Sequence, residues 1–116
     1  MFRIWCRSKI SKARLTGVEL DYEGSIEIPS DLLEAADILP GERVQVVNMN
    51  NGDRLETYVI EGKAGSGHVM LNGPAARRGM VGDVVMILAY AIGSDDEIAP
   101  PRLVLLDEKN RIVEIK

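Results

Sequence analysis

The sequence predicts a mainly β protein, folded as a small barrel with few, short helices. Three observations support this fold class. Short apolar stretches recur along the chain at the spacing of strands, turn signals separate them, and only one stretch has the apolar pattern of a helix. The chain has 116 residues, with no internal repeat and no linker, so we expect one domain over residues 1–116.

The first part of the chain predicts two strands and the helix. Apolar and polar residues alternate over 2–9 and again over 25–28, which is the period of a half-buried strand. A helix is expected next, because Ser30 or Asp31 can cap its first turn. Pro40-Gly41 ends this helix.

A β-hairpin is predicted in the middle of the chain. Strands over 43–49 and 54–60 flank the turn 50–53, which contains an Asn-Gly pair suited to positive φ angles. Arg54 and Tyr58 then lie on the same face of the return strand.

The second half predicts further strands separated by turns. These strands cover 68–71, 84–92, 102–106 and 111–115. The segment 72–78 forms a turn that leads into a short helix, and 93–101 is an acidic connection. The apolar run 84–92 is too short to span a bilayer and predicts a buried strand.

Composition narrows the classes of function. There are 14 Lys and Arg against 18 Asp and Glu, so the net charge is −4, which argues against a nucleic-acid binder. The only cysteine, Cys6, excludes an internal disulfide and fits a reducing compartment. The N-terminus lacks the apolar segment of a signal peptide. We therefore expect a cytoplasmic protein with no membrane partner.

The Gly24-Ser25 pair has two interpretations. It can be a plain turn, because Gly reaches positive φ and Ser bonds its own backbone. It can also be reactive, because the Ser25 hydroxyl lies beside an unshielded Gly24 carbonyl that it can attack. From these residues alone, both interpretations remain open.

Further polar residues have a binding interpretation and a structural one. Arg54 suits a carboxylate or phosphate and Tyr58 can donate a proton, or both belong to an exposed polar face. Lys9 is an isolated lysine of the kind that is usually solvated. The segment Asn72-Gly73-Pro74-Ala75 can hold a polar ligand or simply begin a helix with Pro in its first turn. His68 is the only histidine, so no metal site is expected.

Taken together, seven short motifs occur in a specific order and spacing. They are Ser8-Lys9-Ile10, Asp21-Tyr22-Glu23-Gly24-Ser25, Asp31-Leu32-Leu33-Glu34-Ala35-Ala36, Asn51-Gly52-Asp53-Arg54, Thr57-Tyr58, Asn72-Gly73-Pro74-Ala75-Ala76 and Gly82-Asp83. In these motifs the chain resembles the pyruvoyl-dependent aspartate 1-decarboxylases. The resemblance runs over essentially the whole chain and is weakest after Gly93.

The resemblance implies a double-psi β-barrel, assembled as a homotetramer with active sites between subunits. It also implies a proenzyme that cuts itself between Gly24 and Ser25 into a β chain, 1–24, and an α chain, 25–116. Ser25 attacks the Gly24 carbonyl, the resulting ester undergoes β-elimination, and Ser25 becomes a pyruvoyl group. The Thr57 hydroxyl would stabilise the oxyanion of this cleavage.

The implied reaction is the decarboxylation of L-aspartate to β-alanine and carbon dioxide, which supplies pantothenate and coenzyme A synthesis. The pyruvoyl group would form a Schiff base with the substrate, with no pyridoxal phosphate and no metal. By similarity, Tyr58 is the proton donor. The resemblance also implies the residues that bind the substrate, which are Lys9, Tyr22, Arg54, Thr57, Asn72, Gly73, Pro74 and Ala75.

Two positions depart from many family members, which carry His at position 11 and Ala at position 74. This chain has Ser11 and Pro74, and Pro74 removes one backbone N–H donor from the substrate loop.

Two other functions are alternatives for a barrel of this composition. One is an unprocessed β-barrel that binds an anionic metabolite through Lys9 and Arg54. The other is a small DNA-binding barrel, which the negative charge and the lack of an aromatic stacking surface disfavour. The sequence leaves open whether a maturation helper takes part.

Overall fold

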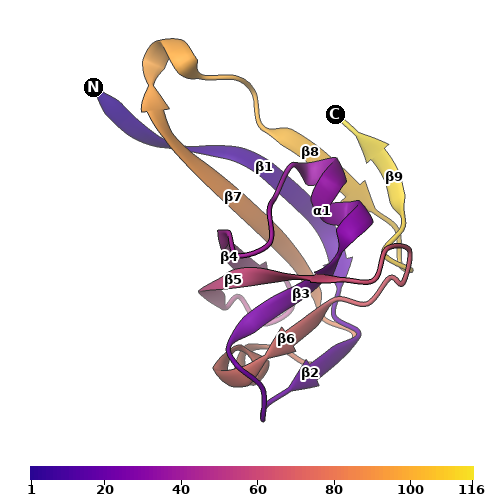
Figure 1. Ribbon diagram of the computed structural model, residues 1–116. Coiled ribbons are helices and arrows are strands. Elements are labelled where there is room, and N and C mark those ends of the chain that lie inside the picture. The colour runs from indigo at the N-terminus through magenta and orange to yellow at the C-terminus, as the bar shows by residue number, and fades with distance from the viewer.

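Nine strands form one strongly twisted sheet in the computed structural model, which describes residues 1–116 (Figure 1). In chain order the elements are β1 (Phe2–Arg14), β2 (Gly17–Glu19), β3 (Ser25–Pro29), α1 (Ser30–Ala36), β4 (Arg43–Asn48), β5 (Arg54–Gly62), β6 (Met70–Asn72), η1 (Gly73–Arg78), β7 (Val84–Ser94), η2 (Asp95–Glu97), β8 (Arg102–Leu106) and β9 (Ile112–Ile115). The prediction of a mainly β chain with short helices is confirmed. None of the helices is long and apolar enough to cross a membrane.

The order of strands across the sheet brings distant parts of the chain together. It runs β2-β6-β3-β5-β4-β7-β1-β8-β9. β3 pairs in parallel with β5 and antiparallel with β6, while β1 pairs antiparallel with β7 and in parallel with β8. Parallel pairs need crossover connections and cannot be closed by hairpins. The start of β3 is therefore enclosed between two strands that come much later in the chain.

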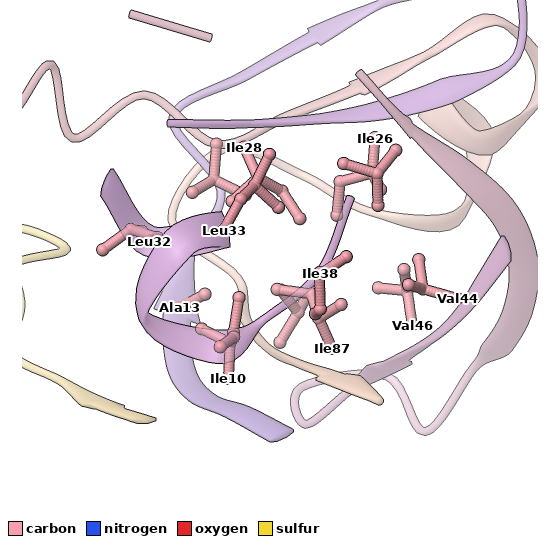
Figure 2. Close-up of a cluster of buried hydrophobic side chains, with 14 of the residues drawn as sticks. Ile10, Ala13, Ile26, Ile28, Leu32, Leu33, Ile38, Val44, Val46 and Ile87 are labelled. Carbon is pink, nitrogen blue, oxygen red and sulfur yellow. The ribbon is translucent and has the colours of Figure 1, made fainter. Parts of the chain in front are cut away.

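The core lies inside the curve of this sheet and beneath α1 (Figure 2). Alternate residues of the strands point inward, as the period of two requires, so that Ile26 and Ile28 of β3 are fully buried. Helix α1 adds Leu32 and Leu33 to the same cluster. Burial of these branched side chains supplies most of the driving force that keeps β3 in place.

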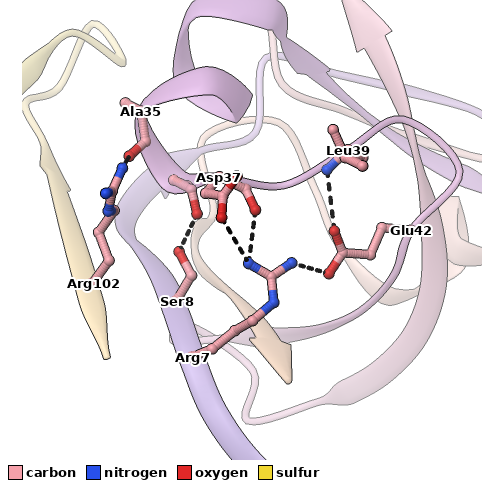
Figure 3. A network of polar contacts seen from close by, with 8 residues as sticks. Arg7, Ser8, Ala35, Asp37, Leu39, Glu42 and Arg102 are labelled. Carbon is pink, nitrogen blue, oxygen red and sulfur yellow. Dashed lines mark hydrogen bonds and ion pairs between the residues drawn. The ribbon is translucent and has the colours of Figure 1, made fainter. Parts of the chain in front are cut away.

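The C-terminal end of α1 is held by side chains from β1 and β8 (Figure 3). Arg7 donates to the Asp37 carbonyl at 2.7 Å and forms an ion pair with Glu42. Ser8 Oγ donates to the Ala36 carbonyl at 2.6 Å, and Arg102 donates to the Ala35 carbonyl at 3.0 Å. These bonds satisfy carbonyls that a helix end leaves without partners, and the cations oppose the partial negative charge there.

The expected side-chain cap at the start of α1 is wrong. The N-cap position is Pro29, and no side chain caps the helix. Asp31 instead accepts a hydrogen bond from the Gly65 backbone at 2.9 Å, which ties the helix to the loop after β5. The helix begins without a cap because β3 leads directly into it, and burial of its apolar face stabilises it.

Two strands differ from their predicted bounds. β1 continues to Arg14, beyond its predicted end. Two bulges interrupt its pairing with β7, and Lys12 has φ 63° within the second bulge. These bulges break the alternating pattern, which hides the second half of the strand in the sequence. β2 was not predicted, since its three residues are too few to show an alternating pattern. The segment predicted as a strand from 68 pairs only from Met70 onward.

The last part of β7 is exposed, which corrects the prediction that 84–92 is buried throughout. After Ala89, the residues Tyr90, Ala91 and Ile92 are exposed, with Ile92 at 76%, and only Gly93 is buried again. The beginning of β1 lies beside it, where Phe2 and Ile4 are also largely exposed. The beginning of β1 and the last part of β7 therefore expose apolar side chains to solvent. These paired strand ends project from the rest of the molecule, near the N-terminus (Figure 1).

The turn between β8 and β9 depends on the ionised form of Asp107. Hydrogen bonds from the backbone N–H groups of Arg111 and Lys109, aided by the charges of the two side chains, lower the pKa of Asp107 below its ordinary 3.8. Because the folded pKa is the lower one, this stabilisation is present above about pH 3.8 and is lost as pH falls through the folded pKa. An NMR titration of the Asp107 carboxyl carbon should show a midpoint below 3.8. A midpoint at or above that value would contradict the assignment, and Asp107→Asn should abolish the signal.

Candidate active site

Ser25 lies at the start of β3 with its hydroxyl in a defined, buried position. The residue is 0% exposed. The Asn72 side chain donates to Ser25 Oγ at 3.1 Å, and Ser25 Oγ donates to the Glu23 carbonyl at 3.4 Å. Ser25 and Asn72 are also opposite each other in the antiparallel pair of β3 and β6. The hydroxyl is therefore directed by the protein and shielded from solvent.

Gly24 precedes Ser25 and lies against the segment that begins η1. A Cβ on Gly24 would come no closer than 3.6 Å to Pro74, which is an ordinary contact. A Cβ on Gly73 would instead meet Gly24 and Tyr22 backbone atoms at 2.8 Å or less. The Gly73 backbone therefore packs closely against Tyr22 and Gly24, just before the Gly24–Ser25 peptide bond.

Thr57 and Tyr58 lie on β5, immediately before the residue at which its pairing with β3 begins. The parallel register starts with Ile26 of β3 opposite Val59 of β5. Thr57 and Tyr58 themselves pair with β4. Thr57 is half-buried, and Tyr58 is 37% exposed.

The two predicted cations are placed differently. Arg54 begins β5, is exposed, and forms no ion pair with a carboxylate of the chain; its guanidinium meets only the Gln45 side chain, at 3.4 Å. Lys9 lies on β1, between Leu88 of β7 and Leu103 of β8. Along the sheet, β5, β4 and β7 separate β1 from β3. The structure therefore does not bring Lys9 to Ser25 through strand pairing within one chain.

The remaining predicted residues surround the cleavage peptide or lie near it. Tyr22 is exposed in the turn just before Gly24. Asn72 ends β6, and η1 begins with Gly73, Pro74 and Ala75. The sequence motifs placed Asn72 in this loop, but they did not indicate its bond to Ser25 Oγ. They also gave no sign of the contact between Gly73 and Gly24, although a Gly-Pro pair after a strand is typical of a sharp turn.

The fold and this site define a small β-barrel protein with a buried serine, preceded by a half-buried glycine, at the start of one strand. A rationally designed double-psi β-barrel protein of known structure matches with a TM-score of 0.50, over 66% of this chain and 90% of that chain, at 17% identity. This match confirms the double-psi β-barrel fold.

Sequence relatives then identify the family. The aspartate decarboxylase family model matches residues 1–113. The chain is 54% identical to the aspartate 1-decarboxylase of Kosmotoga olearia, over 98% of this chain and 99% of that protein. It is 53% identical to the aspartate 1-decarboxylase of Listeria monocytogenes, over 97% of this chain and 90% of that protein. The chain belongs to the aspartate decarboxylase family, as its motifs predicted.

Proposed function

We propose that the chain is a lyase that decarboxylates L-aspartate to β-alanine and carbon dioxide, after cutting itself between Gly24 and Ser25. The observation that carries this proposal is the buried Ser25 hydroxyl, held by Asn72 beside the Gly24 carbonyl in a chain of this family. A plain surface turn would leave the hydroxyl of its serine in water. Here the protein uses an amide side chain to orient it.

Self-cleavage needs only groups that this chain contains, together with water. Ser25 Oγ bonds to the Gly24 carbonyl carbon, the carbon–nitrogen bond breaks, and the Oγ proton passes to the Ser25 nitrogen. Loss of the Ser25 Cα proton then breaks the Cβ–O bond, which leaves a Gly24 carboxylate and a dehydroalanine. Water adds to the dehydroalanine and ammonia leaves, so that a pyruvoyl group remains. The Thr57 hydroxyl stabilises the oxyanion of the first step from the neighbouring strand.

The residues around position 25 fit a pyruvoyl group. The position is small and buried, and the Asn72 amide that donates to a hydroxyl oxygen can donate equally to a carbonyl oxygen. Once formed, the group supplies a carbonyl that captures the substrate amine and accepts the electron pair released with carbon dioxide. Tyr58, one residue before the pairing of β5 with β3, would donate the proton that replaces the lost carboxylate.

Substrate binding is assigned to a cation and to the loop at the start of η1. Arg54 has no carboxylate partner in the chain, so its fork is available for a substrate carboxylate. Tyr22, Thr57 and Asn72 would line the pocket, and the segment from Gly73 to Ala75 would close it. Pro74 has no backbone N–H, so donors in this loop are limited to its neighbours.

Lys9 is proposed to contribute to an active site of another subunit. We propose a homotetramer in which Lys9 of one subunit binds substrate at the site of another, because β1 lies away from β3 along the sheet. The exposed apolar end formed by Phe2, Ile4 and Ile92 supports association, since contiguous apolar surface of this kind marks an interface.

An intact mass spectrum under denaturing conditions tests the cleavage. Two fragments are expected, one ending at Gly24 and one beginning with a carbonyl group in place of the Ser25 amine. The cut protein should then release β-alanine from L-aspartate. A chain that stays whole after prolonged warm incubation, and still binds an anionic metabolite, would favour the binding-module alternative instead.

Arg54→Ala should raise the KM for L-aspartate by roughly ten- to a hundredfold, the equivalent of one lost charge-assisted hydrogen bond. Cleavage should continue, because Arg54 makes no contact with Gly24 or Ser25. Steady-state kinetics of the cut variant measures the effect. Arg111→Ala, on the distant β8–β9 turn, is the matched control and should leave KM unchanged. Normal aspartate saturation in Arg54→Ala would remove Arg54 from the substrate site.

A further inference from the structure

We infer that Gly73 is a positioning residue for self-cleavage, a role that rests on the proposed function. Gly73 opens η1 directly after Asn72, with φ +65°. Its backbone is pressed against the residues that precede the scissile bond. Asn72 thus binds the nucleophile, and Gly73 packs against Gly24, the residue whose carbonyl is attacked.

The backbone of Gly73 leaves no room for a side chain on the side that faces the cleavage segment. A Cβ built on Gly73 would lie 2.5 Å from the Tyr22 carbonyl oxygen, 2.7 Å from the Gly24 nitrogen and 2.8 Å from Gly24 Cα. Real Cβ atoms essentially never approach other atoms to within 3.0 Å. A flexible side chain could turn away from such a contact, but backbone can yield only by moving the segment. Any side chain at position 73 therefore displaces Gly24.

Displacement of Gly24 matters because the Ser25 hydroxyl is also held from β6, outside the cleavage segment, although its second bond, to the Glu23 carbonyl, lies within that segment. Ser25 is paired with Asn72 across β3 and β6, and its Oγ accepts the Asn72 amide at 3.1 Å. If Gly24 shifts while Oγ stays in place, the attacking oxygen no longer faces the carbonyl carbon. A misplacement of about 1 Å costs on the order of a hundredfold in rate for well-oriented reactions.

The chain contains a matched control glycine. Gly67 has φ +69°, and a Cβ there would lie 2.8 Å from the Lys109 carbonyl oxygen. Its own carbonyl accepts the Asn110 amide, so it packs against the β8–β9 turn and not against Gly24. Gly67→Ala therefore imposes the same left-handed strain and a backbone clash with one atom, where position 73 meets three, without touching the cleavage segment.

The experiment follows cleavage and stability separately. Cleavage rates of Gly73→Ala, Gly67→Ala and the unaltered chain are measured by intact mass at intervals. Unfolding is measured with each substitution combined with Ser25→Ala, so that every chain compared is uncut. Both glycine variants should lower stability, and Gly73→Ala by the larger amount, because its Cβ would meet three backbone atoms within 3.0 Å and that of Gly67→Ala only one. Gly73→Ala should slow cleavage by about a hundredfold relative to Gly67→Ala.

Hydroxylamine, which cleaves esters, tests the step that is affected. It should cut the unaltered proenzyme and Gly67→Ala at the ester between Gly24 and Ser25, but Gly73→Ala should yield little of this product. Should Gly73→Ala not fold, Gly73→Asn replaces it, because Asn tolerates positive φ while still carrying the Cβ.

The outcomes separate this inference from the proposed function. Cleavage of Gly73→Ala at a rate no lower than that of Gly67→Ala would overturn the positioning role and leave self-cleavage intact. An unaltered chain that never cuts itself would overturn the proposed function, and with it the role of Gly73.

Discussion

A chain carrying Ser25→Ala is expected to remain whole and to produce no β-alanine above background. Alanine lacks the Oγ that would attack Gly24, and no other hydroxyl is held at that point of β3. The fold should survive, because the side chain is small and the backbone pairing with Asn72 does not involve the hydroxyl. Intact mass and a β-alanine assay measure the two results on the same sample.

Ser8→Ala is the matched control, since Ser8 is the other serine that is fully buried with a bonded hydroxyl. Its Oγ donates to the Ala36 carbonyl at 2.6 Å, far from Gly24 along the sheet. Loss of this bond should cost roughly 0.5–1.5 kcal/mol of stability and leave cleavage unchanged. Production of β-alanine by an uncut Ser25→Ala chain would show that the reaction does not use a pyruvoyl group derived from Ser25.

Thr57→Val is expected to slow self-cleavage by roughly 10²–10³-fold, the usual effect of removing one donor to a developing oxyanion. Valine has nearly the shape of threonine, so β5 should keep its pairing with β3 and β4. Accumulation of the fragment 25–116 over time gives the rate. The expected effect is large because the Thr57 side chain is half-buried, so that water cannot fully replace its donor.

Thr16→Val serves as the comparison for this change. The Thr16 hydroxyl exchanges hydrogen bonds with the Val69 backbone, so its loss weakens the structure but not the cleavage chemistry. Normal cleavage is expected there. Equal slowing in both threonine variants would mean that local stability, and not the Thr57 hydroxyl, limits the reaction.

The local elements of the fold could be predicted, but their pairing could not. The β4–β5 hairpin follows from an Asn-Gly turn between two alternating strands, and every cause of it is contained in adjacent residues. The position of β3 between β5 and β6 depends on contacts between segments far apart in the chain. The bulge at Lys12 breaks the period of two, which is why the second half of β1 was missed.

The candidate site shows the same division. Gly24 and Ser25 could be singled out by type, but the polar residues around them predict an exposed turn as readily as a buried nucleophile. Only the fold reveals that Ser25 is inaccessible to solvent and bonded to Asn72. The crowding at Gly73 arises because η1 begins against the segment that precedes β3, and no spacing in the sequence predicts this contact. Lys9 remains a predicted site residue, because strand pairing within one chain does not bring it to Ser25.

The placement of β1 between β7 and β8 has a consequence for the protein after it is cut. The fragment 1–24 would remain woven into the sheet by ladders on both sides, so the two pieces should leave a gel-filtration column together. Once unfolded, however, they would have to find each other again by diffusion. Folding of the proenzyme chain is unimolecular, whereas recovery of the cut protein would be at least bimolecular and would depend on concentration. Cleavage would therefore make refolding depend on concentration, whereas the continuous chain can form the barrel by itself.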